Sequence, residues 1–311
     1  MQTRRTYTGL FWIGLILTFQ SLSPSPVKAQ SIAVIKSRNL PSFDQVLASL
    51  KTAYPESKIE TYSLKGKKKA QKDILKKITA HPPQLILAMG PLAAQVAKES
   101  LPDIPMLYCM VSNPHRYGLL GKNIVGIPLD VPGETQFSIF KSVVPNLQTI
   151  GVIYDPQESS VLIQEAIEAA RKLGLDLIDV PVSSHKKVPG ALRGMLGKID
   201  ALWMVPDDTV LTTDSFRFFL VTSFENKLPF LAISEIFVKV GALATLSPDH
   251  EELGHQICAL VTQIQNGQLD LSETDVVPLT ETNLVINAKT AKKIGLALPP
   301  EIVESASKVY R

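Results

Sequence analysis

The chain has 311 residues, of which 45% are hydrophobic and 20% are charged, with 32 basic and 29 acidic side chains. A chain of this length can bury one large core or two smaller ones without the help of disulfide bridges. The small positive excess comes from Arg4, Arg5 and Lys28 in the N-terminal segment. The rest of the chain is neutral overall, so its net charge gives no support to a nucleic-acid partner.

Residues 1–29 have the organisation of a cleavable secretory signal peptide. Two arginines precede an apolar run at 10–19, and Val27 and Ala29 stand where a signal peptidase requires small residues. The run is shorter than the roughly 20 residues that span a membrane, so a membrane anchor is the weaker alternative. Because no cysteine lies near the cut, a lipid-anchored form is disfavoured. The sequence therefore predicts a periplasmic protein.

From residue 31 onward, short apolar strands alternate with segments of helical periodicity. The expected strands are 31–37, 58–64, 84–90, 105–114, 149–156, 175–182, 201–208, 229–235 and 242–248, and a further one begins at 284. The expected helices are 41–55, 66–80, 91–100, 158–173, 186–198, 212–227, 250–267 and 300–309, with a short one before 295. Repeated β-α pairs with apolar strands predict parallel sheets covered on both faces.

The pattern falls into two series of about the same size, 31–127 and 150–240, which predicts two doubly wound, Rossmann-like lobes. In open parallel sheets ligands bind beyond the carboxyl ends of the strands, and two facing edges form a cleft. The candidate ligand-binding residues are therefore those that follow or end the strands: Gly90, Pro91, Ser112, Asn113, Tyr154, Asp155, Asp207, Asp208, Ser234 and Glu235.

These candidates divide by chemistry. The serines and Asn113 could donate to a carboxylate, the acids could accept from an ammonium, and Tyr154 could wall the ligand. Each also has a purely local interpretation. Asp155 and Asn113 precede prolines in ordinary turn pairs, and the acids at 207–208 or Ser234 could cap turns or helices.

Other chemistry finds little support in the sequence. It has no Gly-x-Ser-x-Gly elbow, dinucleotide fingerprint or phosphate loop. His250 and His255 are five residues apart, which is not a helical metal-ligand spacing. We therefore expect no catalytic residues, metal site or cofactor. A carboxylate pair of Asp208 and Glu235, as in glycoside hydrolysis, is the enzymatic alternative.

For two further features of the sequence, a purely structural role is the preferred interpretation. Cys109 and Cys258 lie within apolar patterns, which favours two buried thiols over a disulfide. The segment from Lys65 to Lys77 holds seven lysines and one acid. A solvated helix face is the preferred interpretation, with a phosphate- or lipid-binding patch as the alternative.

Six segments, in order, resemble the periplasmic substrate-binding proteins of ABC transporters, in the group with tryptophan- and other amino-acid-binding members. They are PPQLILAMGPLAAQVAKES, IPMLYCMVSNPHRYGLL, IGVIYDP, ALWMVPDDTVL, VKVGALATLSPDHEELGHQ and LVINAKTAKKIGLALPPEIVESASKV. The resemblance implies a type I periplasmic-binding-protein fold. It also implies a small-molecule ligand held by hinge closure, delivery to an ABC permease, and a monomer.

The resemblance further implies three crossings between the lobes, near 143–149, 238–243 and 270–280. Lobe one would comprise 30–145 plus 243–270, and lobe two 146–242 plus 271–311. Pro91 stands where the family usually has Thr or Ser, and Val125 where Thr is common. Both departures remove hydroxyls that could hold a carboxylate. The alternative to transport is a sensory module of the same fold that passes its closed state to a receptor or kinase.

Overall fold

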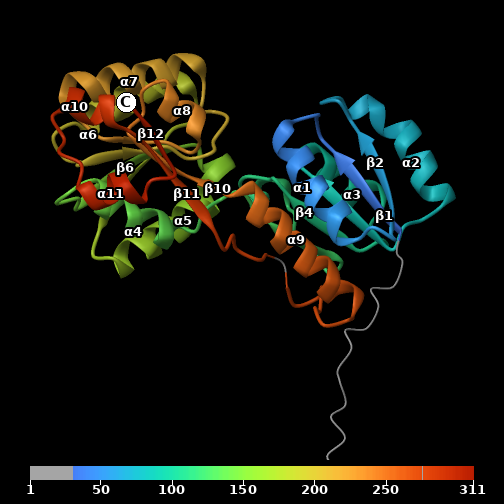
Figure 1. The fold of residues 1–311 in the computed structure, drawn as a ribbon. Coiled ribbons are helices and arrows are strands. Elements are labelled where there is room, and N and C mark those ends of the chain that lie inside the picture. Colours follow the sequence, from blue (N-terminus) through green and yellow to red (C-terminus); the bar gives the residue numbers. More distant parts are fainter. Residues whose placement is uncertain (1–30, 275) are drawn as a thin grey trace, which may run out of the picture.

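The computed structural model describes residues 31–274 and 276–311, which form two α/β lobes side by side (Figure 1). The predicted fold class, two lobes built on parallel sheets, is confirmed. The predicted signal peptide at 1–29 lies outside the described residues. Within the described ranges, no helix is both long and apolar enough to cross a membrane.

Lobe one contains a five-stranded sheet of order β2-β1-β3-β4-β5, in which every pairing is parallel. Its strands are β1 (Ser31–Lys36), β2 (Lys58–Ser63), β3 (Leu85–Met89), β4 (Met106–Cys109) and β5 (Ile124–Ile127). Its helices are α1 (Pro41–Ala53), η1 (Lys68–Ala70), α2 (Gln71–Ala80), α3 (Pro91–Ser100) and η2 (Pro114–Tyr117). All five side chains of β3 are buried, as a central parallel strand requires.

Helix α9 (His250–Gln265) comes late in the chain but packs in lobe one against α1 (Figure 1). The hydroxyl of Tyr54, which follows α1, donates to the carbonyl of Cys258 at 2.8 Å. The two helices approach closely at Gly254, where an added Cβ would lie 2.5 Å from Oγ of Ser49. The contact therefore requires glycine at position 254.

Lobe two contains a seven-stranded sheet of order β12-β11-β10-β9-β8-β6-β7. Its strands are β6 (Thr149–Tyr154), β7 (Asp176–Pro181), β8 (Ala201–Trp203), β9 (Phe230–Leu231), β10 (Ala244–Pro248), β11 (Thr282–Asn287) and β12 (Lys308–Tyr310). Its helices are α4 (Gly133–Val143), α5 (Pro156–Lys172), η3 (His185–Lys187), α6 (Val188–Met195), α7 (Thr213–Asn226), α8 (Glu235–Lys239), α10 (Ala288–Ile294) and α11 (Pro300–Ser305). Strand β11 runs antiparallel to β10, whereas the other pairings are parallel.

Three α-helices of lobe two begin at a residue whose side chain caps the first turn. Asp155 caps α5 by accepting from the amide of Gln157, and Thr212 caps α7 by accepting from the amide of Ser215. Asn287 caps α10 in the same way through the amide of Thr290. Each cap satisfies a backbone donor that the helix leaves unpaired, and the caps at Asp155 and Asn287 join a strand end directly to a helix start.

The first two crossings between the lobes differ from those expected from the sequence, whereas the third falls close to the expected 270–280. Helix α4, expected in lobe one, packs on α5, and the rings of Phe137 on α4 and Trp203 make a T-shaped contact with centroids 5.0 Å apart. The first crossing therefore lies between β5 and α4, at 128–132, rather than at 143–149. Strand β10, also expected in lobe one, pairs with β9 and β11 of lobe two.

The remaining crossings flank α9. The chain enters lobe one after β10, at 249, and returns before β11. On the return, the amide of Val277 donates to the carbonyl of Gly126 on β5 at 2.8 Å, so this stretch still belongs to lobe one. The expected helix at 300–309 ends at 305, because residues 308–310 pair with β11 as a parallel edge strand.

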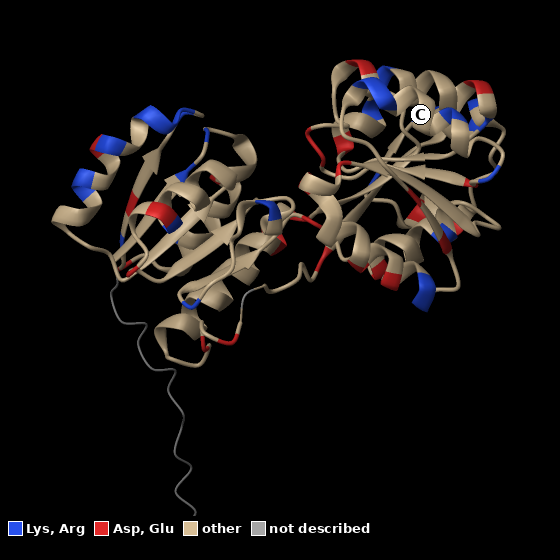
Figure 2. Cartoon of the chain, turned by 180° about the vertical axis from the view of Figure 1, so that it is seen from behind, with Lys and Arg blue, Asp and Glu red and all other residues tan. Residues whose placement is uncertain are grey.

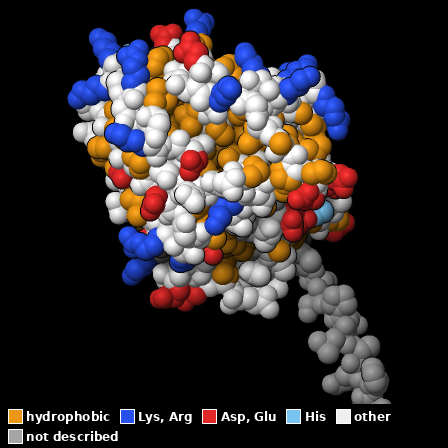
Figure 3. Space-filling view, turned by 90° about the vertical axis from the view of Figure 1, so that its left-hand side faces the viewer, with side chains coloured by type: hydrophobic (Ala, Val, Ile, Leu, Met, Phe, Trp, Pro, Cys, Tyr) orange, Lys and Arg blue, Asp and Glu red, His pale blue; other side chains and the backbone are white. Residues whose placement is uncertain are grey.

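Charged residues of both signs are spread over the two lobes (Figure 2). Lysines concentrate on α2, on the outer side of lobe one (Figure 2). The end of lobe two carries charges of both signs between hydrophobic side chains (Figure 3). Cys109 and Cys258 are both free. Cys109 is buried as expected, and burial raises the pKa of its thiol, whereas Cys258 is partly exposed.

Candidate functional site

A cavity of about 580 Å³ opens between the lobes where the crossing segments meet. Ser112 lines it from lobe one, and Gln136, Trp203 and Ser234 are among the residues that line it from lobe two. The crossing segments contribute Leu129, Asp130 and Val131, and Pro248 and His250. The cavity therefore lies where a rotation of the lobes would change its shape.

A second cavity, about 420 Å³, adjoins the first. The two share five lining residues: Asp130, Val131, Gln136, Leu162 and Trp203. The smaller cavity adds apolar walls from prolines 114, 128, 132 and 278 and polar groups from Asn113, His115 and Glu165. Nε2 of His115 in lobe one lies 3.6 Å from Oε1 of Glu165 in lobe two. The two cavities together form one interlobe cleft.

Asp130 lies on the wall shared by both cavities. Its Oδ2 accepts a hydrogen bond from the backbone amide of Asn113 at 2.5 Å. Burial raises the pKa of Asp130 to about 6, the Asn113 bond opposes this shift, and the charge of Glu165 adds to it. No lysine or arginine among the described residues forms an ion pair with it.

The aromatic wall of the cleft is held in a fixed orientation. The indole Nε1 of Trp203 donates to Oε1 of Gln136 at 3.1 Å, and Nε2 of Gln136 donates to the carbonyl of Val131 at 2.7 Å. The ring of Phe137 packs against the indole with an interplanar angle of 78°. Such bonds leave the amide and the ring little rotational freedom.

The charged groups at the opposite end of the larger cavity already have partners. Oε1 of Glu235 accepts from Nζ of Lys308 and from the hydroxyl of Tyr310, both at 2.6 Å. The bond from Lys308 is the main reason that the pKa of Glu235 lies below its usual value. Burial lowers the pKa of His250, which favours its neutral form. This end of the cleft therefore carries no net charge.

Four of the ten sequence-predicted residues line the cleft. Ser112, Ser234 and Glu235 line the larger cavity, and Asn113 lines the smaller one. Asn113 also connects the lobes, because its Nδ2 donates to the carbonyl of Glu158 on α5 at 2.8 Å. Whether these four side chains contact a ligand stays a prediction.

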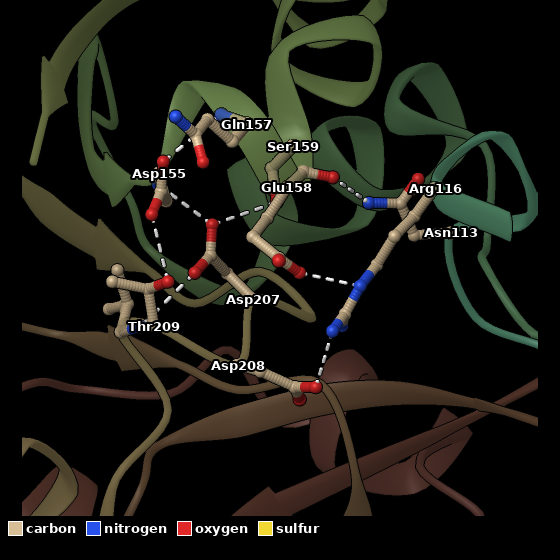
Figure 4. A network of polar contacts seen from close by, with 10 residues as sticks. Asn113, Arg116, Asp155, Gln157, Glu158, Ser159, Asp207, Asp208 and Thr209 are labelled. Atoms are coloured by element: carbon tan, nitrogen blue, oxygen red, sulfur yellow. Dashed lines mark hydrogen bonds and ion pairs between the residues drawn. The ribbon is translucent and has the colours of Figure 1, made fainter. Parts of the chain in front are cut away.

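Asp155 and Asp207 form a buried network within lobe two (Figure 4). Oδ2 of Asp207 accepts from the amide of Asp155 at 2.7 Å and from Oγ of Ser159 at 2.9 Å, and its Oδ1 accepts from the amide of Val210 at 3.1 Å. Asp155 caps α5 and also accepts from Oγ1 of Thr209 at 2.8 Å. The structure therefore gives both acids a local role, and neither lines the cleft.

Asp208 takes part in an ion-pair cluster that joins the lobes (Figure 4). Nη2 of Arg116, from η2 of lobe one, lies 2.7 Å from Oδ2 of Asp208, and its Nε lies 2.5 Å from Oε2 of Glu158. The side chain of Asp208 is 75% exposed, whereas those of Arg116 and Glu158 are 23% and 24% exposed. Arg116 thus spans the gap between the lobes.

Gly90, Pro91 and Tyr154 lie at strand ends but outside both cavities. Gly90 begins α3 with a positive φ of 87°, and a Cβ there would lie 2.8 Å from Oγ of Ser37. The same Ser37 hydroxyl accepts from the amide of Ala93 at 2.9 Å, which occupies one donor of the helix start. The hydroxyl of Tyr154 donates to Asp179 at 3.1 Å.

The sequence analysis missed Asp130, Gln136 and Trp203 as cleft residues. Asp130 follows a strand end like the residues that were chosen, so the same rule applied to β5 would have found it. Trp203 lies inside the apolar run of β8, where core packing is the ordinary interpretation. Its position in the wall of the cleft became visible only in the three-dimensional structure. Among the described residues, no group of three or more metal-ligating side chains occurs.

Two lobes of parallel sheet, three crossings and an interlobe cleft are the architecture of a two-domain binding protein. The family model described as ABC transporter substrate binding protein matches residues 31–310. The chain belongs to this family, which consists of substrate-binding proteins and not enzymes.

Individual relatives agree with this assignment. A "Tyrosine-binding protein" of Clostridioides difficile (strain R20291) is 28% identical over 247 residues, covering 77% of this chain and 71% of that protein. The ligand-free, open structure of a Clostridium difficile substrate-binding protein with adhesive properties superposes with a TM-score of 0.74 at 25% identity, covering 91% and 99% of the two chains. An ABC domain from Streptococcus pneumonia in complex with L-Trp has a TM-score of 0.63 at 23% identity, covering 90% and 99%.

Proposed function

We propose that this protein captures a small organic solute in the interlobe cleft by closing its two lobes, and that it delivers the solute to an ABC permease. The observation that carries the proposal is the position of the cleft. Its walls come from both lobes and from the crossing segments, so lobe rotation opens or encloses it. A ligand that contacts both lobes stabilises the closed state in proportion to its preference for that state.

The ligand class that we propose to test first is the aromatic amino acids. Trp203 and Leu162 give the cleft apolar walls, and Asp130 with the serines gives it a few polar groups, which is the usual composition of a small-molecule site. The tyrosine-binding relative adds support for this class.

We also propose that the protein acts as a monomer in the periplasm after residues 1–29 are removed. The family is one of transporter-associated binding proteins, which work outside the cytoplasmic membrane. N-terminal sequencing of the exported protein would test the cut, with Gln30 as the expected first residue. The sensory alternative uses the same closure, and co-purification with a permease or with a receptor would separate the two.

A thermal-shift screen of the mature protein against the twenty amino acids and related acids and amines tests the proposed capture directly. A ligand that binds only the folded state stabilises it by about 2.7 kcal/mol at a hundred times its Kd. We expect L-tyrosine or L-tryptophan to raise the Tm. The absence of any shift with either compound at millimolar concentration would contradict the aromatic amino-acid assignment.

A further inference from the structure

The charges that line the cleft are unequal in sign. Lys308 is the lysine that lines the larger cavity, and Glu235 already neutralises it at 2.6 Å. Neither lysine nor arginine is among the residues lining the smaller cavity. Asp130 lies on the shared wall, and Glu165 lies on the smaller one. Glu165 faces His115 at 3.6 Å, so among the described acids that line the cleft, Asp130 is the one without a basic partner.

Asp130 is placed to bind a positively charged group of a ligand. One of its oxygens accepts from the amide of Asn113, a bond that fixes the carboxylate but brings no positive charge. Asp130 is half-buried, so its carboxylate has lost part of its hydration without gaining a cation, and an ammonium group inside the cleft would compensate for that loss. The indole of Trp203, which shares the wall, offers an aromatic surface that attracts cations.

The arginine and the helix-start amide that could pair with a ligand carboxylate already have partners. Arg116 pairs with Glu158 and Asp208 and lines neither cavity. At the start of α3, Pro91 has no N–H, and Ser37 takes the amide of Ala93. A ligand carboxylate would therefore meet serine hydroxyls but no free cation among the described residues that line the cleft.

We propose that the cleft recognises its ligand through a positively charged amino group bound by Asp130, and that the ligand carboxylate is dispensable. The substrate class is then aromatic amines as well as aromatic amino acids, whereas aromatic acids without the amino group are excluded. This inference rests on the proposed function, because it assumes that the interlobe cleft is the binding site.

Two matched series of compounds test the inference on the unmodified protein by isothermal titration calorimetry at pH 7.5. One is tyramine, L-tyrosine and 3-(4-hydroxyphenyl)propionate, and the other is tryptamine, L-tryptophan and indole-3-propionate. In the series that binds, we expect the amine to bind within about tenfold of the amino acid. We expect the propionate to bind about 30-fold more weakly or worse, as loss of a buried charged partner predicts.

The outcomes separate the inference from the function on which it rests. Binding of an amino acid without its amine, or of a propionate as tightly as its amino acid, overturns the inference and leaves solute capture standing. Binding by none of the six compounds contradicts both the aromatic ligand class and the inference.

Asp130→Asn provides a second test, with Asp73→Asn on the exposed face of α2 as the matched control. We expect Asp130→Asn to weaken binding of the amine by about 30-fold or more, and the control to change it less than twofold. Circular dichroism establishes that both variants fold. An Asp130→Asn protein that binds the amine as the native protein does would overturn the assignment of this residue.

Discussion

Nη2 of Arg116 in lobe one lies 2.7 Å from Oδ2 of Asp208 in lobe two, which makes the pair a direct electrostatic link across the interlobe gap. Arg116 makes a second contact, 2.5 Å from its Nε to Glu158, which is far less exposed than Asp208. Water screens the charge of exposed Asp208 more than that of half-buried Glu158, so the two acids should differ in what their pairing with Arg116 contributes to stability.

Asp208→Asn should lower the free energy of unfolding by less than about 0.5 kcal/mol, because exposed ion pairs contribute little. Arg116→Met should cost more, about 1–2 kcal/mol, because it leaves the half-buried Glu158 without its cation. Urea denaturation of the two variants and the native protein measures both values. A larger cost for Asp208→Asn than for Arg116→Met would contradict this ranking.

Asp207 is the acid whose loss should damage the fold most. Its side chain is fully buried and accepts three hydrogen bonds that connect β8 to the start of α5 and to the turn at Val210. Asp207→Ala leaves two backbone amides and a hydroxyl without an acceptor, so we expect a loss of about 3 kcal/mol or more in unfolding free energy. Asp208→Ala, one residue away, is the control, and equal Tm values for the two variants would contradict the network.

Gly126 on β5 should tolerate no side chain. A Cβ at this position would lie 2.0 Å from Cζ of Tyr108, and the carbonyl of Gly126 also anchors the returning chain at Val277. Gly126→Ala should therefore destabilise the protein by about 2–4 kcal/mol through overpacking. Gly190→Ala, in α6 with nothing within 4 Å of the added Cβ, should instead stabilise it by about 0.5–1 kcal/mol. Denaturant titrations that show the two variants alike would contradict this account.

Asp130 should make stability and binding depend on pH in opposite directions. Its pKa rises from 3.8 to about 6 in the folded protein, so between these values the folded state holds more protons than the unfolded state. Its contribution to stability therefore falls as the pH rises through this window. Asp130→Asn removes this effect, so above pH 6 the variant should be more stable than the native protein by about 1–3 kcal/mol.

For binding of an amine the ionised carboxylate is required, so the affinity should decline as the pH falls below about 6. Glu165 and His115 face the same cavity, and His250 faces the larger one, so Glu165→Gln and His115→Gln serve as comparison variants. The difference in unfolding free energy between Asp130→Asn and native protein, measured from pH 4 to 7.5, tests the assignment. A difference that does not change with pH would contradict it.

The repeated alternation of buried strands and amphipathic helices was enough to predict two parallel-sheet lobes, because these periodicities follow from burial on both faces of a sheet. The lobe of a particular helix was not predictable in the same way. The apolar face of α4 carries Phe137 and Phe140, and such a face can pack on either sheet. Its place depends on the partner, here Trp203.

The roles of the candidate site residues were likewise not predictable from the local sequence alone. An aspartate after a strand can bind a ligand or cap the next helix, and both roles use the same residue type at the same position. Asp155 and Asp207 accept hydrogen bonds from Thr209, Ser159 and a nearby amide, and they line neither cavity. Those neighbours come from distant parts of the sequence, so the distinction required the tertiary structure.

Small-angle X-ray scattering of the mature protein, with and without a compound that raises its Tm, tests the central claim of capture by lobe closure most directly. Closure of two lobes around a cleft makes the particle more compact, so the radius of gyration should fall on addition of the compound and return to its starting value after dialysis. A compound that binds with an unchanged scattering profile would contradict the account.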